Sequence, residues 1–87
     1  MLPDDSAEHC YLCGRYGPSD VHHCIHGTAG RKLADRYGLT VHLCHSCHMR
    51  LHDTGWMDRH LEQAAQRAFE TDHSHEEWMR IFGKNYL

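Results

Sequence analysis

The alternation of hydrophobic and polar residues changes along the chain and separates short extended segments from helical ones. Residues Val21–Ile25 alternate, which predicts a strand with successive side chains on opposite faces. Residues 31–37 have the pattern of a short helix that Gly38 ends, because glycine readily takes the left-handed conformation after a helix. Residues 39–43 predict a second strand. The two strands are expected to pair as an antiparallel hairpin with a long connection.

The second half of the chain has helical spacing. A helix is predicted to begin within residues 44–47 and to continue to about His52. Apolar residues then recur at helical spacing, which predicts another helix: Met57, Leu61, Ala64, Ala65 and Ala68. Ser74 and Glu77 form a capping box before a final apolar run that Gly83 ends. The aromatic residues of these helices are expected in the core: Trp56, Phe69, Trp78 and Phe82.

These elements predict an α+β fold in one domain that spans residues 1–87. Residues 1–9 are acidic and expected to be flexible, residues 10–53 form a small ββα core, and residues 54–87 form an extension of two helices. A domain of 87 residues buries little surface and gains from a stabilising cross-link. The two C-terminal helices either cover the core or provide a face for a homodimer.

The cysteine and histidine content points to metal as that cross-link. The chain has five Cys and eleven His. It begins without a basic segment followed by an apolar run, and no stretch approaches the roughly 18 apolar residues of a membrane span. We therefore expect a cytoplasmic protein without a membrane partner, in which paired cysteines bind metal rather than form disulfides.

Two pairs of cysteines share one spacing. Cys10 and Cys13 form the first pair, and Cys44 and Cys47 form the second. A Cys-x₂-Cys turn supplies two thiolates to a tetrahedral zinc ion, so two such turns complete a closed structural site. Because zinc binding and folding are coupled, this site is expected to hold the domain together. Cys24 remains either a small buried side chain, which we favour, or a further metal ligand.

Histidines cluster around the same cysteine pairs. His22 and His23 lie in the first predicted strand. His48 and His52 follow the second cysteine pair and share one face of a helix. The zinc brings strand and helix together, so these imidazoles are expected to converge. Such a cluster suits phosphodiester hydrolysis, which needs a divalent cation at the phosphate and a base for the attacking water. Other histidines of this segment are expected at the surface or behind the ligands: His26, His42 and His45.

The clustered histidines and the second cysteine pair define a motif of three segments: Val21-His22-His23, Leu43–His48 and His52. It resembles the HNH, or ββα-metal, nuclease family in its four-cysteine zinc form. Three longer segments resemble small phage-associated HNH-like proteins: His22–Gly27, Arg31–Val41 and Ile81–Leu87. The resemblance covers most of the chain from Cys10 onward. It implies an HNH-like fold for the ββα core and a bacterial or phage source.

The resemblance assigns a role to each of four histidines. His23 matches the general base, and His22 matches the metal ligand that precedes it. His48 matches the last histidine of the motif, a metal ligand, and His52 matches the extra ligand of the all-histidine variant in colicin-type nucleases. The ion at this catalytic site would be Mg²⁺, Mn²⁺ or Zn²⁺. No Asn precedes the second cysteine pair as it does in the family, and His42 or a backbone carbonyl is expected to orient the base.

Charge is distributed unevenly along the chain. The formal net charge is −3, yet residues 21–52 carry a net charge of +3 and seven of the eleven His. Four basic residues of this segment are candidates for phosphate contacts, with a solvated charged face as the alternative: Arg31, Lys32, Arg36 and Arg50. The basic segment is compatible with DNA as the partner.

Two functions from different classes remain open. The first is a metal-dependent endonuclease or nickase that hydrolyses DNA with His23 as general base. The second is a non-catalytic zinc-binding module that binds nucleic acid or a protein partner in phage recombination or packaging, which the acidic flanks and the absent Asn favour. A metal carrier agrees less well with the sequence, because the histidines are organised around the cysteine pairs rather than in a flexible tract.

Overall fold

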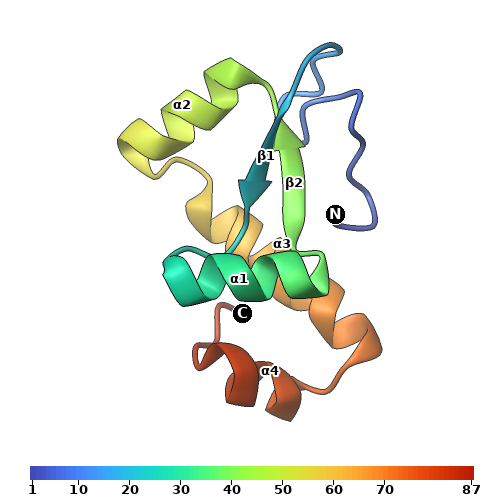
Figure 1. Ribbon diagram of the computed structural model, residues 1–87, viewed down its shortest axis with the longest axis vertical. Helices are drawn as coiled ribbons and strands as arrows, with labels where there is room; N and C mark the ends of the chain where they lie inside the picture. Colours follow the sequence, from blue (N-terminus) through green and yellow to red (C-terminus); the bar gives the residue numbers. More distant parts are fainter.

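A two-stranded antiparallel hairpin lies at the centre of the computed structural model, which describes residues 1–87 (Figure 1). Strand β1 comprises Asp20–His23, and strand β2 comprises Thr40–Leu43. Helix α1, Thr28–Tyr37, forms the connection and crosses one end of the hairpin. Gly38 ends α1 in the left-handed conformation with φ of 70°. The predicted hairpin with a long connection is therefore confirmed.

Three further helices follow the hairpin. Helix α2 spans His45–Thr54, α3 spans Asp58–Asp72 and α4 spans His75–Phe82. Helix α2 begins within the second cysteine pair, as predicted. The capping box of α4 is also present, because the backbone N–H of Glu77 donates to Ser74 Oγ over 3.1 Å. The prediction of an α+β fold with two C-terminal helices is confirmed.

The turn between α2 and α3 contains two residues in the left-handed conformation. Gly55 ends α2 with φ of 68°, and Met57 precedes α3 with φ of 68°. Glycine adopts this conformation freely, whereas the side chain of a methionine makes it strained. The turn places Asp58 at the start of α3, where its carboxylate reaches the ring of His26.

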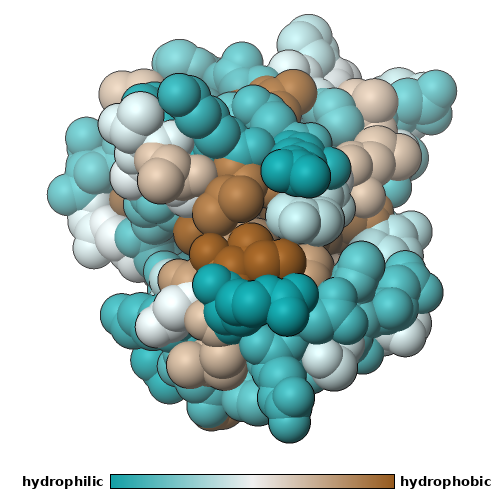
Figure 2. All heavy atoms as spheres, turned by 60° about the horizontal axis from the view of Figure 1, so that its bottom comes forward, coloured by the Kyte–Doolittle hydropathy of each residue, from teal (hydrophilic) through white to brown (hydrophobic).

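The hydrophobic core is one cluster of 16 buried residues that joins the hairpin to the helices. Val41 and Leu43 of β2 are buried together with Leu61 of α3 and Trp78 of α4. The four aromatic residues expected in the core belong to this cluster or pack against it. Figure 2 shows a small hydrophobic area on one face, framed by hydrophilic side chains. The C-terminal helices thus cover the core, and none of the four helices combines the length and apolar character needed to cross a membrane.

Residues 1–9 were expected to be flexible, and two of them, Leu2 and Asp5, pack against β2. Leu2 is 2% exposed, and its backbone N–H donates to the carbonyl of Thr40 over 2.9 Å. The buried carboxylate of Asp5 accepts hydrogen bonds from the backbone N–H of His42 at 3.1 Å and from its Nδ1 at 2.6 Å. The acidic composition suggested a solvated segment, but the backbone N–H of Leu2 and the carboxylate of Asp5 find partners on a distant strand.

Candidate metal centres

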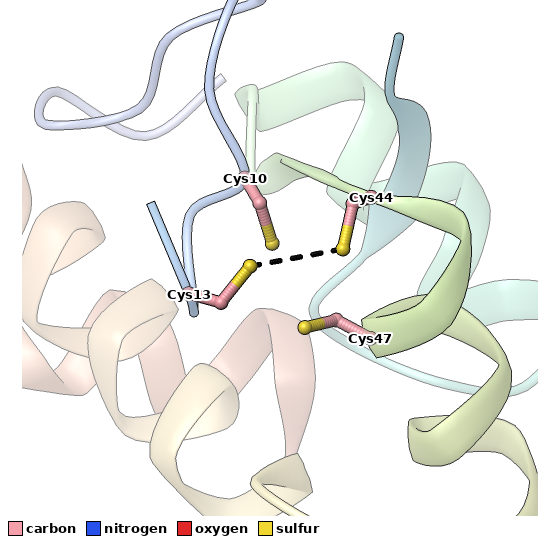
Figure 3. Close-up of side chains that lie close together, drawn as sticks. All are labelled: Cys10, Cys13, Cys44 and Cys47. Atoms are coloured by element: carbon pink, nitrogen blue, oxygen red, sulfur yellow. Dashed lines mark hydrogen bonds between the residues drawn. The ribbon is translucent and has the colours of Figure 1, made fainter. Parts of the chain in front are cut away.

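The four predicted zinc ligands form one cluster. Cys10 and Cys13 lie on the loop before β1, whereas Cys44 and Cys47 lie at the start of α2 (Figure 3). Their Sγ atoms all lie within 4.8 Å of one another, and those of Cys13 and Cys44 are 3.7 Å apart. A tetrahedron with Zn–S bonds of about 2.3 Å has edges of about 3.8 Å, whereas the S–S bond of a disulfide is about 2.0 Å. The cluster therefore has the geometry of a structural zinc site rather than of a disulfide.

The backbone around the cluster favours a thiolate at Cys10. Burial raises the pKa of this thiol, but hydrogen bonds from the backbone N–H groups of Cys13, Cys44 and Leu12 outweigh burial and lower the pKa to about 6. Burial and the neighbouring sulfur atoms raise the pKa of Cys47. All four sulfurs are held as thiolates only when a cation compensates their charge, which is the condition that a zinc ion meets.

Cys24 lies outside this cluster. Its side chain is 0% exposed and belongs to the hydrophobic core. Burial raises the pKa of the thiol to about 12, so that the group stays neutral at physiological pH. The interpretation of Cys24 as a small buried side chain is confirmed.

The three predicted histidine ligands converge in a second cluster. His22 of β1 and His48 and His52 of α2 each place one ring nitrogen within 4.8 Å of the others. The two helical residues share one face because they are four positions apart. The ring centroid of His48 lies 4.7 Å from that of His52 and 5.3 Å from that of His22. These three rings line a pocket of about 220 Å³ together with His23 and Arg31.

Asp20 fixes the orientation of His48. Its Oδ2 accepts a hydrogen bond from Nδ1 of His48 over 3.2 Å. Because a carboxylate only accepts, a neutral His48 carries its proton on Nδ1 and its lone pair on Nε2. That Nε2 lies 3.1 Å from Nε2 of His52. Hydrogen bonds from His48 and His45 also lower the pKa of Asp20, and a carboxylate behind a ligating imidazole is a common feature of metal sites.

His22 is the buried member of the histidine cluster. His22 is 4% exposed, and its Nε2 has no hydrogen-bond partner. Burial, followed by the charges that His48, His26 and His52 would carry, lowers the pKa of His22 to about 4. His22 is therefore neutral at pH 7. A buried ring nitrogen without a partner is unfavourable, and a cation bound to the cluster would satisfy it.

His23 lines the pocket but is not one of the three clustered rings. Its Nε2 lies 2.7 Å from Oδ1 of Asp35 on α1. Because the carboxylate accepts, a neutral His23 carries its proton on Nε2 and leaves the lone pair of Nδ1 free. His42, which with a backbone carbonyl was one of two groups expected to orient this ring, instead donates its Nδ1–H to Asp5. That expectation is corrected, because the partner of His23 comes from α1.

The four basic candidates occupy different environments. Arg31 of α1 lines the histidine pocket. Lys32 and Arg36 are exposed on the same helix, outside the lining of this pocket. The guanidinium of Arg50 lies 4.1 Å over the ring of Trp56, which it covers on one face. Arg31 is therefore the basic residue positioned to contact a ligand in the pocket.

Sequence interpretation missed the carboxylates that partner the histidines. Asp20 and Asp35 are the only acidic residues from position 20 to position 52. This scarcity of carboxylates among seven histidines was the only signal in the sequence that could have indicated these partners. Asp58 lies on a different helix, and its Oδ1 is 3.1 Å from Nε2 of His26. His22, His26 and Asp58 form a third group of potential metal ligands within 4.8 Å of one another.

No protein-family model, curated protein or solved structure matches the chain. Interpretation of the site therefore rests on the residues and their geometry.

Proposed function

We propose that this chain is a metal-dependent HNH-type endonuclease or nickase that hydrolyses phosphodiester bonds in DNA. The observation that carries the proposal is one pocket lined by three clustered imidazoles, a fourth imidazole held by a carboxylate, and an arginine. The order of elements supports the proposal as well, because an antiparallel hairpin precedes a helix that begins at the four-cysteine cluster. The resemblance to the HNH family and this pocket point to the same reaction.

The ligand set favours a borderline-soft divalent ion. Imidazole nitrogens suit Zn²⁺ and similar transition-metal ions better than Mg²⁺, which prefers oxygen ligands. His22, His48 and His52 would hold the ion, and Asp20 would keep His48 in the ligating tautomer. Three protein ligands leave room for a water molecule and a phosphate oxygen. When bound, the ion would polarise the scissile phosphate and stabilise the leaving oxygen.

His23 would accept the proton of the attacking water. Imidazole is the side chain whose ordinary protonation range lies closest to neutral pH, which suits a general base. Nδ1 of His23 would take the proton while Nε2–H donates to Asp35, whose charge stabilises the imidazolium as it forms. In this proposal, Asp35 takes the orienting role of the Asn that is missing before the second cysteine pair.

Arg31 would contact the DNA backbone at the edge of the pocket. Its guanidinium is able to form two parallel hydrogen bonds to a phosphate, which would hold the scissile bond against the histidine cluster. Backbone contacts position DNA without reading its sequence. A domain this small contacts few bases, so we expect cleavage with low sequence specificity.

Nicking of supercoiled plasmid DNA tests the proposal. The zinc-containing protein is incubated with added Zn²⁺, Mn²⁺ or Mg²⁺, and the relaxed product is measured over time. We expect metal-dependent nicking that falls roughly 10²- to 10⁴-fold in His23→Ala, with unchanged zinc content and circular dichroism. His60→Ala is the matched control, because the side chain of His60 is exposed on α3 and forms no hydrogen bond. Full activity of His23→Ala rejects the assigned base, and inactivity of the wild type with every metal rejects the nuclease.

One feature favours a second function, a non-catalytic zinc-binding module for nucleic acid or a protein partner in phage recombination or packaging. Carboxylates from Asp20, Asp35 and Asp58 lie beside the histidines, and the formal net charge is −3. Such carboxylates repel phosphates. This module would keep the zinc at the cysteines, bind no second metal and cut no DNA. Metal analysis before and after mild chelation separates the two functions, because the nuclease also contains an exchangeable ion.

A further inference from the structure

A third group of potential ligands lies next to the histidine cluster. His22, His26 and Asp58 each offer one ligand atom, and these atoms lie within 4.8 Å of one another. The proposed hydrolysis uses neither His26 nor Asp58. Both residues line, with His22 and His52, a second pocket of about 240 Å³. The group is therefore accessible from outside and adjacent to the proposed catalytic ion.

Three separate elements bring these ligands together. His22 lies on β1, His26 follows this strand, and Asp58 is the first residue of α3. The ring centroids of His22 and His26 are 5.6 Å apart, and Nε2 of His26 lies 3.1 Å from Oδ1 of Asp58. Met57, with φ of 68°, immediately precedes Asp58 at the start of α3. Two imidazoles and one carboxylate are a ligand set that zinc accepts.

The buried Nε2 of His22, the residue that both groups share, also points to a ligand. His22 is only 4% exposed, and its buried Nε2 forms no hydrogen bond with any protein group. Buried polar atoms almost always have a partner, and an atom that lacks one is explained by a bound water or ion. A nearby cation would provide this partner.

We propose that His22, His26 and Asp58 form a second position for a divalent cation of the zinc type, which shares His22 with the cluster formed by His48 and His52. A neutral imidazole has one unprotonated nitrogen and therefore binds one cation at a time. The two positions thus compete for His22, and a single exchangeable cation is distributed between them. The inference concerns metal binding, so its test does not require cleavage of DNA.

Calorimetric titration with Zn²⁺ at neutral pH tests the inference, with the cysteine site already filled. His52→Gln removes one ligand of the first position and leaves the second intact, so we expect one exchangeable zinc per chain to bind. Adding Asp58→Asn to this variant is expected to weaken zinc binding roughly tenfold or more. Adding Asp53→Asn, which changes an exposed carboxylate of α2 without a hydrogen-bond partner, is the matched control and should leave the affinity unchanged.

The ring ¹⁵N signals of the histidines locate the ion in the same variant. Zinc added to His52→Gln should shift the ring signals of His26 and leave those of His60 in place. The inference is overturned if His52→Gln binds no exchangeable zinc, if Asp58→Asn adds no loss of affinity, or if the His26 signals do not move. These measurements involve no DNA, so an absence of nicking does not affect their outcome.

Discussion

Removal of zinc from the cysteine cluster is expected to unfold the domain. A domain of 87 residues has a free energy of unfolding of roughly 4–13 kcal/mol, from about 0.05–0.15 kcal/mol per residue. Structural zinc contributes about 10–16 kcal/mol to the folding of small zinc domains. The core of 16 buried residues also includes three of the ligands, Cys10, Cys44 and Cys47. The contribution of the ion therefore matches or exceeds the net stability expected for the whole domain, so that its loss leaves no favourable free energy of folding.

The assay follows zinc and structure in one sample. A zinc-specific chelator is added at neutral pH under reducing conditions, a colorimetric indicator measures zinc release, and far-ultraviolet circular dichroism measures helix content. Both signals should change together, and one equivalent of Zn²⁺ should restore the helices. Cys47→Ser should fold poorly, whereas Cys24→Ala should retain its zinc because Cys24 lies outside the cluster. A protein that keeps its helices and its cooperative thermal transition after complete zinc loss would refute the reasoning.

Three further predictions concern single residues. Asp35→Ala is expected to lower the kcat of nicking roughly tenfold to a hundredfold with little change in KM, because His23 loses its partner. Asp35→Asn should recover part of the rate, since its carbonyl oxygen accepts the same hydrogen bond; equal kcat values for all three proteins would argue against an orienting role. Burial raises the pKa of Cys24 from 9.0 to about 12, so the stability that its neutral thiol provides is complete below pH 9 and is lost as the pH rises toward 12. In urea denaturation, moving from about pH 8 to about pH 10.5 should cost the wild type about 2 kcal/mol more than Cys24→Ala, and a pH-independent difference would contradict this. Met57→Asn is expected to raise the free energy of unfolding by roughly 0.5 kcal/mol, because Asn tolerates the left-handed conformation. Met49→Asn, at an exposed position within α2, should lower the free energy of unfolding, and thermal melting that ranks the two variants in the opposite order would exclude strain at Met57.

Local signals in the sequence predicted most of the elements. The Ser74–Glu77 capping box and Gly38 mark helix ends because their hydrogen bonds act within a few residues. The repeated cysteine spacing predicted the four-cysteine cluster, because few arrangements bring two such turns to one ion. Strand β1 was predicted to reach Ile25 but ends at His23, where its pairing with Thr40 ends. The end of a short strand depends on its partner as well as on its own pattern.

The long-range polar contacts could not be predicted from the sequence. Each of three carboxylates pairs with a histidine of another segment: Asp5–His42, Asp35–His23 and Asp58–His26. A single carboxylate carries no period or spacing, and its partner is determined by how the whole chain packs. Convergence of His22, His48 and His52 was predictable, because the two cysteine pairs dictate which strand and helix meet.

Anomalous X-ray scattering from crystals of the zinc-containing protein soaked in Co²⁺ is the most direct test of a second, exchangeable metal centre beside a fixed one. We predict a zinc peak about 2.3 Å from the four cysteine sulfurs. We also predict a separate cobalt peak about 2.0–2.2 Å from ring nitrogens of His22, His48 and His52. A single peak at the cysteines, with Nε2 of His48 still directed at Nε2 of His52 under saturating Co²⁺, would contradict the proposed metal-dependent chemistry.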